Sequence, residues 1–106
     1  MTPIGKWLEA LRSDRYTQEF AALKKDGAHC AIGLLFELNG CLSWDGKLLR
    51  KKGTLAATRM EALAVLQRLG VPLALAERVV EMNDVDRQPF AVIADFVEKR
   101  MAEEGA

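Results

Sequence analysis

The sequence predicts an all-α fold: a single compact domain of about five helices over residues 1–106, with an irregular basic loop in the middle. Three observations support this prediction. Apolar residues recur at spacings of three and four in several segments, which is typical of helices with one buried face. Prolines and glycines stand where such helices would begin and end. The chain has 106 residues, half of them apolar, so it can build one core but not two.

The first helix is predicted to begin at Thr2-Pro3, because the threonine hydroxyl can cap a helix and proline is well tolerated in its first turn. Its apolar stripe is Ile4, Trp7, Leu8 and Leu11. Phe20 and Leu23 then predict a short further turn of helix, which Asp26-Gly27 would end.

Residues 29–38 fit two patterns. Apolar side chains alternate there as in a strand, and Asn39-Gly40 is typical of a hairpin turn. In a helix, His29, Gly33 and Glu37 would form one narrow small-or-polar stripe, and Asn39-Gly40 would be the C-terminal cap. The neighbouring helices and the lack of a second strand favour the helix, and the strand stays as the alternative.

The second half of the chain predicts three more helices. Thr54 or Thr58 can cap the first of them, and Gly70 ends it. The next helix opens at Val71-Pro72, and the last follows a polar turn at residues 83–88. The stripes expected to face inward are Ala62, Leu63, Leu66 and Leu69; then Leu73, Ala76, Val79 and Val80; then Phe90, Ile93, Ala94, Val97 and Met101.

Composition and charge exclude several classes of protein. Fifteen basic and fifteen acidic residues balance, so no overall field directs the chain to nucleic acid or to an anionic membrane. Apolar runs are far shorter than a membrane span, and the first residues lack the pattern of a secretory signal. Cys30 and Cys41 are too few for a disulfide scaffold, so free thiols in a reducing cytoplasm are expected.

No residue pattern predicts catalysis, a metal site or a cofactor. Cys30 follows the single histidine, His29, but neighbouring helical residues point about 100° apart and do not form a thiolate–imidazole pair. One histidine and two cysteines at these spacings match no zinc pattern. Cys30 is expected to be a small buried apolar residue, and the carboxylates are expected to lie on solvated helix faces. The sequence therefore predicts a protein that is not an enzyme.

Two segments are candidates for binding a partner. The polar turn offers Asn83, Asp84, Asp86 and Arg87, although helix capping by Asn83 and Asx turns explains most of its composition. The basic loop offers Lys47, Arg50, Lys51 and Lys52. Four cations in six residues form a local basic patch, which a solvated loop also explains.

Two other functions stay open as alternatives. The segment Leu66–Glu81 fits a helix-turn-helix around Gly70, which would bind nucleic acid, but only Arg78 on its second helix can pair with phosphate or guanine. A small-molecule or nucleotide site could use the stripe of His29, Gly33 and Glu37 together with Asn83. A glycine in such a stripe lets a ligand approach the backbone closely. Helix packing explains that stripe as well.

Two separated stretches resemble motifs of one protein family. Residues 29–38, HCAIGLLFEL, resemble "CCLGVLCDL", and residues 81–98, EMNDVDRQPFAVIADFVE, resemble "LNDxGxSFxEIADxIE". Both motifs occur in this order in a family of small uncharacterised proteins of bacteriophages and prophages. Ala31 and Phe36 replace two family cysteines, and this loss argues further against a thiol-based role. Asp86 stands near the usual turn glycine of the family.

The resemblance implies a phage or prophage accessory protein. Small proteins of this kind frequently act by occluding a host protein, including components of defence systems. The leading hypothesis is therefore a cytoplasmic, non-enzymatic protein that binds a bacterial host protein and inhibits a defence system. Its expected contact surface combines the polar turn with the basic loop.

Overall fold

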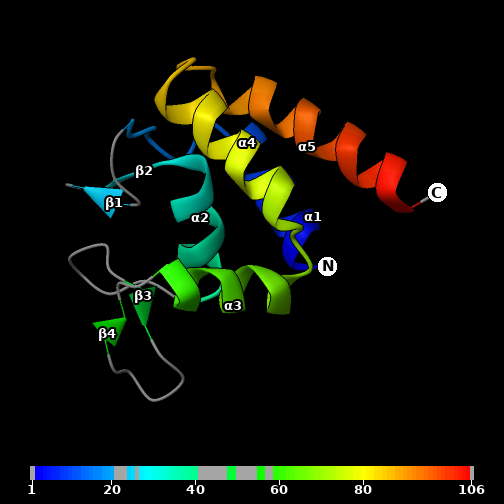
Figure 1. Cartoon of the computed structure of the whole chain (residues 1–106). Helices are drawn as coiled ribbons and strands as arrows, with labels where there is room; N and C mark the ends of the chain where they lie inside the picture. Colours follow the sequence, from blue (N-terminus) through cyan, green and yellow to red (C-terminus); the bar gives the residue numbers. More distant parts are fainter. Residues whose placement is uncertain are drawn as a thin grey trace.

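The computed structural model describes residues 2–20, 24–25, 27–40, 48–49, 55–56 and 59–105, and for residues 24–25, 48–49, 55–56, 59–62 and 104–105 it describes the backbone alone (Figure 1). Five helices dominate these residues, which confirms the predicted all-α class. The helices are α1 (Pro3–Arg12), α2 (Ala31–Leu38), α3 (Arg59–Leu69), α4 (Leu73–Asp84) and α5 (Phe90–Gly105). Two short antiparallel pairs join β1 (Lys24–Lys25) to β2 (Ala28–His29) and β3 (Leu48–Leu49) to β4 (Leu55–Ala56).

Helix α2 forms the centre of the core. Every residue from Ala31 to Phe36 is buried, and the helix packs against both α1 and α4 (Figure 1). Helix α5 covers α1 and α4 from the other side, and α3 packs against α4. The helical interpretation of residues 29–38 is confirmed for Ala31–Leu38, and the strand alternative is wrong there. The first two residues are exceptions, because His29 lies in β2 and Cys30 is the N-terminal cap of the helix.

Helix α1 is fixed at both ends. The Thr2 hydroxyl accepts a hydrogen bond from the Gly5 amide at 3.0 Å, as the predicted cap requires. At the other end, Arg12 forms ion pairs with Asp95 at 2.7 Å and Glu98 at 3.3 Å on α5. All three side chains are exposed, so these pairs add only modestly to stability.

The buried face of α4 differs from the predicted one. Leu73 and Val80 were expected inside, but they are 43% and 40% exposed. Leu75 and Met82 are buried in their place, together with Val79. Leu73 and Val80 lie two turns apart on one side of the helix, whereas the contacts with α2 and α5 bury the opposite side. The stripe predicted for α5 is confirmed from Phe90 to Val97.

The segment after α1 also differs from expectation. Phe20 lies in a bend and not in the predicted short helix, and residues 21–23 lie outside the described part of the chain. Residues 17–19 run beside β2 instead: the His29 amide donates to the Thr17 carbonyl at 2.9 Å, and the Glu19 amide donates to the His29 carbonyl at 2.8 Å. Across the described residues, no helix combines the length and apolarity needed to cross a bilayer.

Candidate functional site

The polar turn begins later than the sequence indicates. Helix α4 continues through Asp84, and Asn83 is part of its last turn. Asn83 is also fully buried, with 0% of its surface exposed. Its assignment as an exposed partner-binding amide is therefore wrong, and it does not cap the helix as expected. It faces the core because the α4 stripe extends inward from Val79 through Asn83, one helical turn further on.

The Asn83 side chain uses its full hydrogen-bonding capacity. Its Oδ1 accepts from Gln18 Nε2 at 2.9 Å and from the Ala31 amide at 3.1 Å. Its Nδ2 donates to the Glu19 carbonyl at 2.8 Å and to Asp84 Oδ1 at 2.8 Å. A primary amide has two donors and two acceptor lone pairs, so all four are satisfied. Asn83 therefore joins α4, the first residue of α2 and the segment after α1.

The same network fixes the turn itself. Gln18 Nε2 also donates to the Gln88 carbonyl at 2.7 Å, and the Gln88 amide donates to the Met82 carbonyl at 2.9 Å. The Asp86 amide donates to the Glu81 carbonyl at 3.0 Å. The turn is thus tied both to α4 and to the segment after α1. No sequence motif identifies Gln18 as a partner of the turn, because the two are about 70 residues apart in the chain.

Side chains around the turn add further contacts. Arg78 on α4 forms ion pairs with Glu81 and, at 3.3 Å, with Asp86. Arg87 adopts a left-handed backbone with φ of 51°, and its guanidinium lies 4.9 Å from the centre of the Phe20 ring. A non-glycine residue in this region is uncommon and marks a tightly constrained turn.

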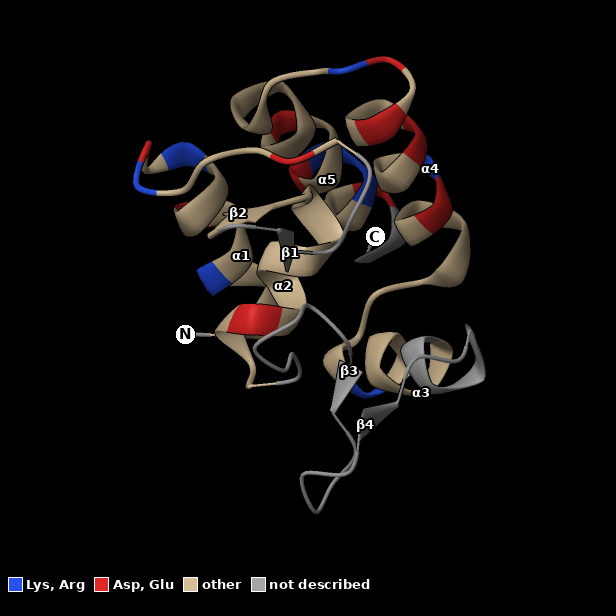
Figure 2. Cartoon of the chain, turned by 90° about the vertical axis from the view of Figure 1, so that its left-hand side faces the viewer, with Lys and Arg blue, Asp and Glu red and all other residues tan. Residues whose placement is uncertain are grey.

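The turn presents one apolar and two charged side chains to solvent. Val85 is 73% exposed, and Asp86 and Arg87 are exposed beside it. Figure 2 shows the acidic and basic residues at the top of the view, where the turn connects α4 to α5. Of the four predicted turn residues, Asp86 and Arg87 are exposed at this surface, Asp84 is half-buried at its edge and Asn83 lies beneath it.

The basic loop is the other half of the predicted contact surface, and its cations are not among the described residues. Lys47, Arg50, Lys51 and Lys52 lie outside the described residues, and so does Cys41. The combined surface of turn and basic loop therefore stays a prediction.

The geometry of α3 and α4 bears on the nucleic-acid alternative. The two helices pack together, with Gly70 in the left-handed conformation between them at φ of 79°. However, the exposed face of α4 carries Glu77 and Glu81, and Figure 2 shows acidic residues along this helix. Its Arg78 is paired with Glu81. Acidic side chains on the recognition helix would repel phosphates, so this arrangement does not favour DNA binding.

The three residues of the predicted ligand stripe come from two elements, because His29 lies in β2 and the other two lie in α2. Gly33 is buried within α2, and His29 is buried at 5% exposure in β2. His29 Nε2 lies 3.5 Å from Glu37 Oε1, close enough for an ion pair when the imidazole is protonated. Neither ring nitrogen has a hydrogen-bond partner among the described residues, and the ring meets Tyr16 edge-on at 6.1 Å. With Gly33 buried, the three do not line an open site.

Cys30 caps α2 from within the core. Its Sγ accepts a hydrogen bond from the Gly33 amide at 3.2 Å, and the residue is 4% exposed. Burial raises the pKa of the thiol to about 11, since the apolar surroundings disfavour the thiolate. The expected unreactive, buried role is consistent with this environment. Within the described residues, no group of three metal-binding side chains occurs.

This pKa gives the fold a dependence on alkaline pH. The folded chain holds the Cys30 proton more tightly than the unfolded chain does, because the folded pKa is raised from 9.0 to about 11. The stability from this group is complete below the unfolded pKa and is lost as pH rises through about 11. Two pKa units correspond to about 3 kcal/mol.

The matched variant is Cys30→Ser, which keeps a capping acceptor but does not titrate in this range. Urea unfolding from about pH 8 to 11 should show wild type losing about 2 kcal/mol relative to the serine variant. Lysine and tyrosine titrate in both proteins, so the difference isolates Cys30. Parallel pH profiles would contradict the assignment.

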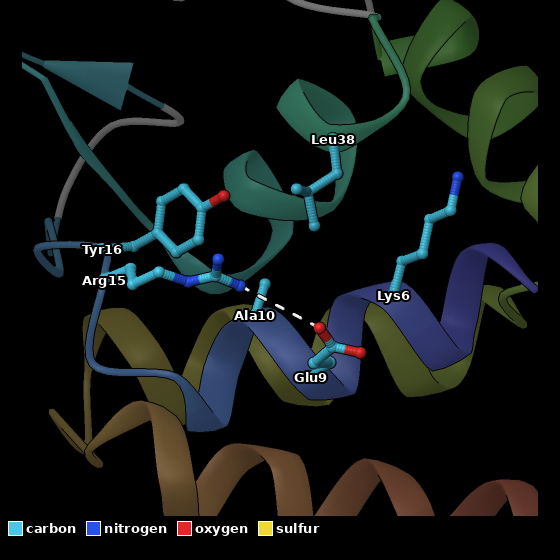
Figure 3. Close-up of a pocket in the computed structure, with 6 residues that line it drawn as sticks. All are labelled: Lys6, Glu9, Ala10, Arg15, Tyr16 and Leu38. Carbon is cyan, nitrogen blue, oxygen red and sulfur yellow. Dashed lines mark ion pairs between the residues drawn. The ribbon is translucent and has the colours of Figure 1, made fainter. Parts of the chain in front are cut away.

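A hollow of about 280 Å³ lies between α1, the segment after it and the end of α2 (Figure 3). The Ser13 hydroxyl ends α1 by donating to the Ala10 carbonyl at 2.8 Å. Asp14 then adopts a left-handed backbone with φ of 61°, which reverses the chain. The residues lining the hollow are Lys6, Glu9, Ala10, Arg15, Tyr16 and Leu38.

Comparison of the chain with protein-family models, with curated proteins and with solved structures gives no match. The functional interpretation therefore depends on the chain's own geometry: a fixed turn that exposes Val85, Asp86 and Arg87, and a separate hollow beside α1.

Proposed function

We propose that this chain is a non-enzymatic accessory protein of a phage or prophage that binds a bacterial host protein and antagonises a host defence system. The contact is made by the turn Asp84 to Gln88. One observation carries this proposal: Val85 is 73% exposed at a turn whose backbone is fixed by tertiary hydrogen bonds. The sequence resemblance supports the phage context, and the geometry supports the mode of binding.

A fixed turn is suited to recognition for an energetic reason. Binding by a mobile segment loses conformational entropy when that segment becomes ordered, and this loss weakens the complex. Gln18 and Asn83 order this turn before any partner arrives. An exposed valine beside Asp86 and Arg87 then offers an apolar anchor with charged neighbours, which is the usual arrangement of an interface centre and its rim.

The proposal separates the turn from the rest of the surface. Val92 on α5 is also an exposed valine, at 43%, but it lies within a helix and outside the turn. Val85→Asp should abolish partner binding, because burying an unpaired carboxylate at an interface centre is unfavourable. Val92→Asp should leave binding intact and so serves as the matched control.

Pull-down from a bacterial lysate, with wild type and both variants immobilised, tests the binding. Wild type and Val92→Asp should recover one host protein at stoichiometric level, and Val85→Asp should not. Plating of a phage restricted by a defence system, on cells that express each variant, tests the antagonism in the same order. Recovery of no partner by wild type, or equal recovery by all three proteins, would refute the proposal.

A further inference from the structure

The hollow beside α1 combines an apolar floor with cations at its opening. Ala10 is buried, and Tyr16 and Leu38 are half-buried, so these three form the interior. Lys6 and Arg15 are exposed and line the same space. Figure 3 shows Leu38 pointing from α2 toward α1, with the Tyr16 ring above Arg15 and extending toward α2. A ligand with an apolar ring and a negatively charged end would match this arrangement of apolar interior and cationic opening.

The two cations differ in what already neutralises them. Arg15 lies 4.0 Å from Glu9 Oε1, the longest separation that counts as an ion pair, and both side chains are more than half exposed. Such a pair is weak and easily exchanged for another carboxylate. No carboxylate among the described residues forms an ion pair with Lys6. The hollow therefore has positive charge available at its opening.

The size of the hollow limits what it can hold. A cavity of about 150 Å³ accommodates one benzene ring. A space of 280 Å³ therefore fits a single ring with a short substituent, and it is too small and too open for a nucleotide. The edge-on contact of Tyr16 with the buried His29 supports the wall that such a ring would touch.

We infer that this hollow is a binding site for a small aromatic carboxylate, whose ring contacts Tyr16, Ala10 and Leu38 and whose carboxylate lies between Lys6 and Arg15. This site differs from the stripe of His29, Gly33 and Glu37, and it is independent of the turn that carries the proposed function. A ligand here would leave Val85 exposed.

A second hollow, of about 320 Å³ between α3 and the start of α4, serves as an internal control. Its lining is uncharged and consists of Leu63, Leu66, Gln67, Val71, Pro72 and Leu73. A ligand that binds only through its apolar ring would occupy either hollow. A ligand whose carboxylate forms ion pairs with Lys6 and Arg15 should bind in the first hollow and not in the second.

The experiment titrates the ¹⁵N-labelled full chain with benzoate, benzamide and benzylamine, which share a ring and differ in charge. Benzoate should give saturable shifts with a millimolar dissociation constant, confined to the amides of residues 6–16 and 38. Benzamide should bind about tenfold more weakly, and benzylamine more weakly still. The double variant Lys6→Ala/Arg15→Ala should weaken benzoate binding about tenfold, as the loss of two exposed charge contacts implies.

The control variant is Lys99→Ala, which removes an exposed cation outside the hollow. It should bind benzoate as wild type does. Because Lys6 and Arg15 are exposed, the double variant should keep the wild-type spectrum elsewhere. The inference is overturned if benzoate gives no saturable shifts, if benzamide binds equally well, if the double variant is unaffected, or if the shifts map to the second hollow.

Discussion

Replacing Asn83 with leucine should lower the free energy of unfolding by about 3 kcal/mol, one of the two largest effects expected for this fold. Leucine fills a similar volume but offers no hydrogen bond. The Ala31 amide and the Glu19 carbonyl each lose their bond to the Asn83 side chain. Each buried group left unpaired costs about 1–3 kcal/mol, so the sum is substantial even after partial relaxation.

Equilibrium unfolding in urea, followed by circular dichroism, measures this effect. The chain's other asparagine supplies the control, because Asn39 is half-buried at the end of α2 and bonds locally to the Leu35 carbonyl at 2.7 Å. Asn39→Leu should cost about 1 kcal/mol, because the hydrogen bonding of this half-buried side chain is partly exposed to solvent. If Asn83→Leu costs no more than Asn39→Leu, the network around Asn83 does not have the role assigned to it.

Replacing Trp7 with alanine should lower the free energy of unfolding by about 4 kcal/mol. Trp7 is fully buried in α1, and its Nε1 donates to the Ala31 carbonyl at 2.8 Å. The substitution therefore opens a large cavity and also removes the side-chain hydrogen bond that joins α1 to the start of α2. Ala31 is the residue whose amide is bonded by Asn83, so both predictions concern the attachment of one helix.

A second variant at Trp7 separates the effect of the cavity from the effect of the lost hydrogen bond, and a variant at Leu8 serves as a control for packing. Trp7→Phe keeps much of the volume but loses the bond, so it should cost about 2 kcal/mol. Leu8→Ala, at a half-buried position in the same helix, should cost about 1 kcal/mol, which is less than Trp7→Phe. The reason is that the leucine side chain buries less apolar surface than the fully buried Trp7. Thermal or urea unfolding of the three variants tests the order. A smaller loss for Trp7→Ala than for Leu8→Ala would contradict the packing described for α1 and α2.

Local pattern predicted most of the helices. Thr2 caps α1 as expected, and the stripe from Phe90 to Val97 is buried. These features depend on residues close in sequence, where periodicity and capping act directly. Leu73 and Val80 were assigned to the wrong side of α4, because apolar residues occur on more than one face of that helix. Only the contacts with α2 and α5 decide which face is covered.

The candidate site was harder to predict, because its framework is built from distant residues. The sequence correctly marked Asp86 and Arg87 as exposed turn residues, yet it also placed Asn83 with them. A polar side chain next to charged neighbours is usually exposed. Asn83 can be buried because Gln18 and the Ala31 amide donate hydrogen bonds to its side chain. Both partners are distant in sequence, so no local pattern predicts these bonds. The hollow beside α1 also depends on a chain reversal at Asp14.

The central claim is that the turn from Asp84 to Gln88 is ordered by Gln18 in the free protein, ready to bind. Backbone ¹⁵N order parameters of the wild type and of Gln18→Ala test it most directly. The wild-type turn should have values near those of α5, about 0.85, and the variant should fall below about 0.6 in the turn while α5 is unchanged. A turn that is already flexible in the wild type, or equally rigid without Gln18, would contradict the account.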